Sequence, residues 1–181
     1  RLDACSAYAA RVAERAPCAC EVWVNGWYDY YGWETYNPNN EPNLHAPYVY
    51  LWTGQPWKTT DVVRAASTLF TDGPDGVTGN DDLGTMSAWH VLSSIGVYPI
   101  VPGAELWGLT PPLFDAVTIT LDPEVFGRDS LRLTADGVAP DTHYTQSVSL
   151  GGEPLDRAWV TGDELTAAGT LDVTVGTEPS A

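Results

Sequence analysis

The pattern of apolar and polar residues changes near residue 113. Before that point apolar residues recur every three or four positions, as they do on the buried face of a helix. We expect helices over residues 1–16, 47–52, 59–70 and 85–95. After that point the period is two, in the segments AVTITL, LRLTAD, YTQSVSL and TLDVTV. These segments predict about five short antiparallel strands.

The ends of two predicted helices carry recognisable signals. Thr59 or Thr60 suits the N-cap of the third helix, because a hydroxyl can accept a hydrogen bond from a free N–H of the first turn. The fourth helix is expected to begin near Thr85 or Ser87 and to end at Gly96. Its apolar face would hold Met86, Trp89, Leu92 and Ile95.

The predicted fold class is mixed α and β, with a helical region over residues 1–112 and a β-strand region over residues 113–181. Residues 20–42 would form a long loop rich in Trp and Tyr. Such loops are uncommon in compact domains unless they are functional or covered. We therefore expect the native fold to include further sequence, the chain being a fragment, a processed product or one of two subunits.

Composition narrows the classes of partner. The chain has 24 acidic and 8 basic residues and a net charge of -16, which disfavours nucleic acid and anionic membranes. No apolar run approaches the roughly 18 residues that a spanning helix needs. A neutral ligand, a cation or a protein partner remains open. The cysteines are three in number and lack zinc-site spacing, so we expect them to be structural or incidental.

The loop before the fourth helix is rich in aspartate. Asp75-Gly76 is typical turn chemistry, and one aspartate would suit the positive N-terminus of the helix. One carboxylate is enough for that second role, yet Asp81 and Asp82 are adjacent. The other carboxylate is therefore a candidate general base or cation ligand. The spacing of oxygen donors excludes an EF-hand.

A second polar stretch, YNPNNEPNLHAPY, runs from Tyr36 to Tyr48. It combines several asparagines with Glu41 and His45 among aromatic residues. Amides and carboxylates bind sugar hydroxyls, and aromatic rings stack on the apolar face of a pyranose. The same composition also fits a surface turn, and spacing alone leaves both interpretations open.

Together the two stretches closely resemble the catalytic-domain signature of glycoside hydrolase family 92. In that family an NEPxxHxPYLY segment is followed by a GQPWKT turn and a PDGxxGN(D/E)DxGxMSAWYV segment. Within residues 39–99 this chain reads NEPNLHAPYVY, GQPWKT and PDGVTGNDDLGTMSAWHV, in the same order. The segment YTQSVSLGGEPLDRAWV is similar to the family's C-terminal strands. The resemblance implies an exo-α-mannosidase, with α-1,2-linked mannose expected, that inverts the anomeric centre and requires Ca²⁺. It also implies an (α/α)6 barrel, of which this chain would supply about four C-terminal helices.

The resemblance also implies roles for individual residues. Asp82 matches the general base, with Asp81 beside it, and Asn80 stands where the family often has an aspartate. Substrate binding is implied for Asn40, Glu41 and His45, and Trp27 and Trp33 would border the pocket. Candidate Ca²⁺ ligands are Asn40, Glu41 and Asp81.

The family's general acid is a glutamate in an upstream motif that has no match in residues 1–38. The N-terminal portion of the enzyme, in the same or a separate chain, would then supply it. A mannose-containing oligosaccharide or N-glycan is the expected substrate, and a secreted location is implied. The alternative is a non-catalytic carbohydrate-binding or interaction module derived from this fold.

Overall fold

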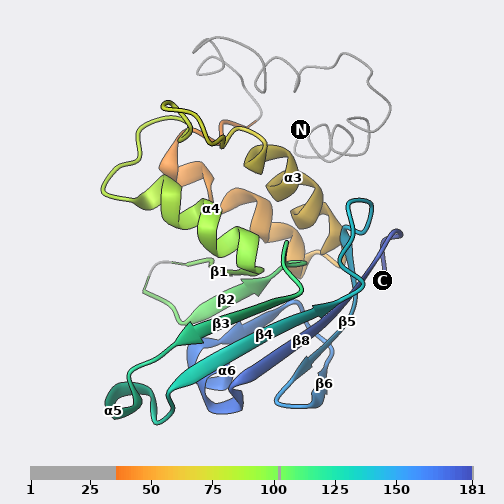
Figure 1. The fold of residues 1–181 in the computed structure, drawn as a ribbon. Helices are drawn as coiled ribbons and strands as arrows, with labels where there is room; N and C mark the ends of the chain where they lie inside the picture. The colour runs from red at the N-terminus through yellow and green to blue at the C-terminus, as the bar shows by residue number, and fades with distance from the viewer. Residues whose placement is uncertain (1–35, 102, 181) are drawn as a thin grey trace. The chain divides into compact units, whose positions relative to one another are not determined.

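The structure is a computed structural model that describes residues 36–101 and 103–180 (Figure 1). The chain divides into two compact units, one ending at Val91 and the other beginning at Leu92. The helix predicted over residues 1–16 lies outside the described residues. The predicted division into a helical region over residues 1–112 and a β-strand region over residues 113–181 stays a prediction.

The first unit is helical. Its elements are the 3₁₀ helices η2 (Glu41–Asn43) and η3 (Ala46–Trp52), then α3 (Trp57–Ser67) and the first part of α4 (Thr85–Ile95). The predicted helices near residues 47–52, 59–70 and 85–95 are therefore confirmed, the first as a 3₁₀ helix. Met86 and Trp89 on α4 are fully buried, as the apolar pattern predicts.

The predicted cap of α3 is wrong. The helix begins at Trp57, and its N-cap is Pro56, which makes no side-chain capping bond. Thr59 lies inside the helix and is buried, and its hydroxyl donates to the carbonyl oxygen of Pro47 at 2.9 Å. The hydroxyl links η3 to α3, and this contact between distant segments cannot be inferred from the local cap pattern.

The second unit contains two sheets. The larger sheet has the order β3-β4-β8-β5-β6, and the smaller has the order β1-β2-β7. The strands of the larger sheet are β3 (Ala116–Thr120), β4 (Ser130–Asp136), β5 (Tyr144–Leu150), β6 (Glu153–Leu155) and β8 (Thr170–Gly176). The remaining elements are β1 (Val97–Pro99), β2 (Leu106–Leu109), β7 (Trp159–Thr161), α5 (Pro123–Phe126) and α6 (Gly162–Ala168).

The four quoted segments are confirmed as strands β3, β4, β5 and β8, but the sheet that they form is not wholly antiparallel. β4 and β8 run parallel, with Leu133 opposite Leu171, whereas the other pairs are antiparallel (Figure 1). Alternation of apolar and polar residues reports which face is buried and is the same for both strand directions. The sequence pattern therefore predicts the strands without their relative direction.

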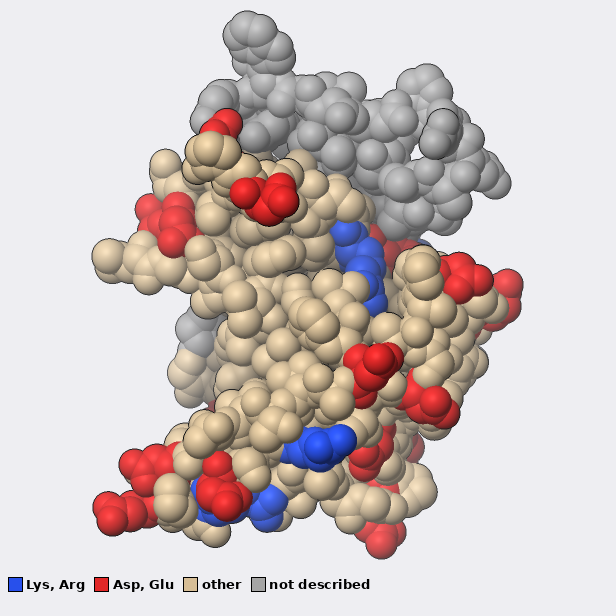
Figure 2. Space-filling view, viewed as in Figure 1, with Lys and Arg blue, Asp and Glu red and all other residues tan. Residues whose placement is uncertain are grey.

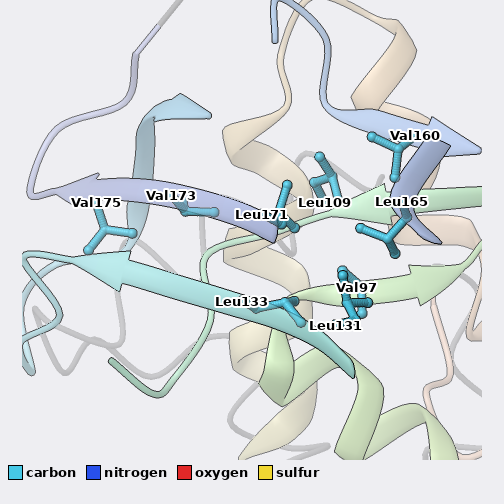
Figure 3. Close-up of a cluster of buried hydrophobic side chains, with 9 residues drawn as sticks. All are labelled: Val97, Leu109, Leu131, Leu133, Val160, Leu165, Leu171, Val173 and Val175. Carbon is cyan, nitrogen blue, oxygen red and sulfur yellow. The ribbon is translucent and has the colours of Figure 1, made fainter. Parts of the chain in front are cut away.

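The core of the second unit follows from that alternation. Every second residue of β4 and β8 is buried, and these side chains gather with others from β1, β2, β7 and α6 (Figure 3). The cluster consists of Val97, Leu109, Leu131, Leu133, Val160, Leu165, Leu171, Val173 and Val175.

Among the described residues, no helix is long and apolar enough to cross a membrane.

Leu171 offers a direct test of this core, because its side chain is only 1% exposed. We expect Leu171→Ala to lower the free energy of unfolding by about 2–5 kcal/mol through lost burial and the cavity left behind. Thr174 lies exposed on the same strand. Thr174→Ala should therefore change the free energy of unfolding by no more than about 0.5 kcal/mol. Urea denaturation followed by circular dichroism compares the two, and equal losses would contradict the assigned core.

Candidate active site

The acidic loop opens with a tight turn. The N–H of Gly76 donates to the carbonyl oxygen of Gly73 at 3.0 Å, and the N–H of Thr71 donates to that of Gly76 at 2.9 Å. Pro74 and Asp75 occupy the centre of this turn, where proline fixes the first central φ. Asp75 is thus a turn residue, as its pairing with glycine predicts.

Asp81 caps helix α4. Its Oδ1 accepts hydrogen bonds from the backbone N–H of Ser87 at 2.8 Å and from the hydroxyl of Ser87 at 2.7 Å. The Ser87 hydroxyl, followed by the Ser87 N–H, holds the pKa of Asp81 below its ordinary value. Asp81 is therefore the carboxylate that serves the helix N-terminus.

Asp82 makes different contacts. Its backbone carbonyl accepts from the hydroxyl of Thr85 at 2.8 Å, whereas its carboxylate accepts no hydrogen bond from the residues that the structure describes. Asp82 and Leu83 have φ angles of 42° and 59°, which non-glycine residues seldom adopt. The side chain of Asp82 is exposed. The turn therefore holds Asp82 in an unusual backbone conformation, with its side chain exposed to solvent.

The asparagine-rich segment is organised by Asn37. The side-chain oxygen of Asn37 accepts a hydrogen bond from the backbone N–H of Asn39 at 3.0 Å. The backbone carbonyl of Asn37 accepts one from the side-chain amide of Asn43 at 3.1 Å. The chain then enters η2, with Asn40 as its N-cap and Glu41 as its first residue. Asn40 is exposed and Glu41 is partly exposed, so both reach solvent beside an ordered turn.

The two polar stretches meet at Asn39. The hydroxyl of Thr78 donates to Oδ1 of Asn39, across 39 positions of sequence. Gly79, with φ of 68°, approaches so closely that a Cβ there would lie 2.6 Å from the carbonyl oxygen of Asn39. Glu41 follows Asn39 by two residues, and Asp82 follows Gly79 by three. The contact therefore brings the segment of the implied substrate residues to the loop of the implied base.

Asn39 and Thr78 were not singled out by sequence reasoning. No local pattern predicts their contact, because the two residues lie 39 positions apart in the sequence. Asn39 is 3% exposed, which marks it as the internal contact.

His45 and His90 are both half-buried histidines of the first unit. Burial lowers the pKa of each imidazole below its ordinary value, which favours the neutral ring. His45 is the N-cap residue of η3. His90 stacks on Phe70 with ring centroids 4.4 Å apart, and Phe70 also stacks on Trp89 at 5.7 Å. This aromatic group supports α4, the helix that carries Asp81 at its start.

Comparison with known proteins identifies the family. Residues 11–177 match the glycosyl hydrolase family 92 catalytic domain. The chain belongs to this family. It is 31% identical over 144 residues to an uncharacterized secreted glycosidase of Arthroderma benhamiae, covering 78% of this chain and 18% of that protein.

Two solved structures place the family 92 chain among known folds. It is similar to the α-mannosidase BT3965 of Bacteroides thetaiotaomicron, with 28% identity, a TM-score of 0.71, and coverage of 80% of this chain and 19% of that one. It is also similar to the inverting mannosidase BT2199 of the same species, with 37% identity, a TM-score of 0.69, and coverage of 78% and 19%. The chain therefore spans about a fifth of the length of these relatives.

The described part of the family 92 chain contains candidate ligands for a metal ion. Among residues 36–101 and 103–180, no three His, Cys, Asp or Glu residues gather as a metal site would require. Asn40, Glu41 and Asp81 offer the oxygen donors that Ca²⁺ prefers, although Oδ1 of Asp81 already accepts two hydrogen bonds. These ligands stay a prediction. Trp27 and Trp33 lie outside the described residues.

Charge is spread unevenly over the surface. Acidic side chains are scattered over the face seen in Figure 2, whereas Lys and Arg form a few small patches. The view agrees with the net negative charge of the chain.

The hydrogen bonds of Asp81 predict a measurable titration. We expect Ser87→Ala to raise the pKa of Asp81, because the Ser87 hydroxyl is the largest cause of its lowering. The remaining N–H bond should keep the pKa below its ordinary value. Since the native pKa is lowered, the cap stabilises the fold above the ordinary pKa, and this stabilisation is lost as pH falls through the native value.

NMR titration of the Asp81 carboxyl carbon measures this change. Ser94→Ala, on the same helix, serves as the control and should leave the Asp81 titration unchanged. An Asp81 pKa that is equal in Ser87→Ala and wild type would show that the hydroxyl does not hold the carboxylate.

Proposed function

We propose that this chain supplies the general base and part of the substrate site of a Ca²⁺-dependent exo-α-mannosidase that inverts the anomeric centre. The observation that carries the proposal is the different bonding of two adjacent carboxylates. Asp81 accepts two hydrogen bonds at the start of α4, whereas the exposed carboxylate of Asp82 accepts none from the described residues. A capping role explains Asp81 and leaves Asp82 for chemistry.

The proposed reaction is a single displacement. A water oxygen attacks the anomeric carbon while Asp82 accepts a proton from that water. The bond from the anomeric carbon to the leaving oxygen breaks on the opposite face, and a carboxylic acid gives that oxygen its proton. Inverting enzymes hold these two carboxyl groups about 6.5–9.5 Å apart, which leaves room for the water.

The acid is expected from sequence outside the described residues. Because the chain spans about a fifth of its relatives' length, the active enzyme would need the remaining portion, in the same or a second polypeptide. A secreted location is proposed from the name of the fungal relative, a secreted glycosidase.

Glu41, His45 and Asn40 are proposed to bind mannose hydroxyls. A carboxylate accepts hydrogen bonds from hydroxyls, an amide both donates and accepts, and a neutral imidazole does the same through its two nitrogens. Burial favours that neutral form of His45. An α-1,2-linked mannose at a chain end is the proposed substrate. The names of the two Bacteroides relatives, both mannosidases, support mannose as the sugar.

Calcium is proposed to be held by oxygens of Asn40, Glu41 and Asp81, together with groups from the remaining portion of the enzyme. When bound, a hard cation can hold sugar hydroxyls and favour a flattened ring. The Asp81 carboxylate keeps Oδ2 available for this role, since both hydrogen bonds from Ser87 go to Oδ1.

Substitution of Asp82 tests the base. In the complete enzyme, we expect Asp82→Asn to lower kcat on α-1,2-mannobiose by about 10²–10⁴-fold, because the amide cannot accept the proton from water. Asp75→Asn, in the turn of the same loop, should keep wild-type turnover. NMR of the first product formed reports the anomer, and inversion predicts β-mannose.

Two outcomes would contradict the proposal. Wild-type turnover in Asp82→Asn would remove the proposed base. The non-catalytic module would be favoured instead if the wild-type protein binds mannoimidazole but does not hydrolyse α-1,2-mannobiose. Mannoimidazole is the ligand in another solved structure of BT3965.

Removal of calcium tests the metal. We expect EDTA to abolish turnover and Ca²⁺ to restore it. Mg²⁺ should restore it poorly, since Mg²⁺ requires a smaller and more regular set of ligands. Full turnover after exhaustive chelation would show that the reaction needs no divalent cation.

A further inference from the structure

We propose that Thr78 and Asn39 are positioning residues, whose hydrogen bond fixes the spacing between the turn at Glu41 and the base Asp82. This inference rests on the proposed function and deepens it. Neither residue matches a catalytic or substrate-binding position of the family signature, so their role would be to hold other groups in place.

The middle of the acidic loop, residues 77–80, makes few hydrogen bonds to the rest of the described chain. Within the part of the chain that the structure describes, residues 77–80 make no hydrogen bond other than that from Thr78 to Asn39. The turn at residues 71–76 and the cap at Asp81 are each closed by their own bonds. The segment between them is therefore tied to the asparagine-rich turn at one point.

The environment of the bond favours an ordered link. Asn39 is 3% exposed, so water competes little for its side-chain oxygen. Gly79 packs its backbone against Asn39, where a Cβ would lie 2.6 Å from the carbonyl oxygen and 3.1 Å from the Asn39 Cβ. The hydrogen bond and the close backbone contact act at neighbouring residues and hold the same two segments.

The link sets a relation between two ordered pieces. On one side, Asn37 and η2 fix the chain from Asn39 to Glu41. On the other side, the cap on α4 fixes the chain from Asp81 onward. Each piece keeps its own shape without Thr78. The bond and the Gly79 contact together therefore set where Asp82 lies relative to a sugar held at Glu41, and misplacement of reacting groups is costly in rate.

Thr78→Val and Thr78→Ser form a matched pair in the complete enzyme. Valine keeps the shape of threonine and removes the donor, whereas serine keeps the hydroxyl. We expect Thr78→Val to lower kcat by about 10- to 100-fold, because a small misplacement of the base impairs attack by water. Thr78→Ser should restore kcat to within a few fold of the wild type. KM should change little, since Glu41 and its neighbours keep their local turn.

A double-mutant cycle tests the pair itself. If the two side chains act through one bond, Asn39→Ala combined with Thr78→Val should lower kcat no more than the more damaging of the two single changes. Hydrogen exchange of residues 77–84, followed by mass spectrometry, should be faster in Thr78→Val than in Thr78→Ser. This measurement reports the link without requiring turnover.

The outcomes separate the two proposals. Wild-type kcat in Thr78→Val, with Asp82→Asn inactive, overturns the positioning role and leaves the proposed function intact. Additive effects in the double variant overturn the pairing. Wild-type turnover in Asp82→Asn removes the proposed function and the positioning role with it. Hydrogen exchange of residues 77–84 that is unchanged in Thr78→Val overturns the link itself. A lower kcat that merely follows a lower Tm, equal in the valine and serine variants, also overturns positioning.

Discussion

The close approach of Gly79 to the backbone of Asn39 is the constraint on which the candidate site depends. A Cβ at residue 79 would lie 2.6 Å from a carbonyl oxygen, and the φ of 68° is one that glycine adopts at little cost. Only glycine satisfies both conditions readily. The Thr78 hydroxyl then meets the side chain of Asn39, and two segments 39 positions apart become neighbours. Without this approach, Glu41 and Asp82 would belong to unrelated loops.

Adjacent carboxylates at the end of that loop are tolerated because their surroundings differ. Asp81 is stabilised as an anion by the Ser87 hydroxyl and N–H, which lower its pKa, and it faces the positive end of α4. Asp82 is exposed, so water can screen its charge from that of Asp81. Asp82 and Leu83 have positive φ angles, and Asp81 is the carboxylate that accepts from Ser87 at the start of α4. A local conformation thus separates two chemically identical neighbours.

The sequence predicted the features that depend on local pattern and missed those that depend on distant contacts. Periodicity predicted α3, α4 and four strands, and turn chemistry predicted the role of Asp75. The parallel pairing of β4 with β8 was missed, because alternation carries no strand direction. Helix α6 was missed although Thr161 and Glu164 form a capping box that is visible in the sequence. Thr59 was misassigned because its partner, Pro47, lies in another element.

The distinction between local and distant contacts also applies to how the proposed active site would be assembled. Among the described residues, the hydrogen bonds that shape the loop of the proposed base join residues between Asn37 and Ser87, all within the first unit. In the proposed mechanism, the general acid would come from sequence outside the described residues and would lie on the opposite face of the sugar from the base. The spacing between acid and base would then depend on how the rest of the enzyme packs on this unit. The spacing between base and mannose would depend on the contacts of Thr78 and Gly79 with Asn39. In the proposed enzyme, separate contacts would therefore position the substrate and the acid, so that a change in one set of contacts need not alter the other.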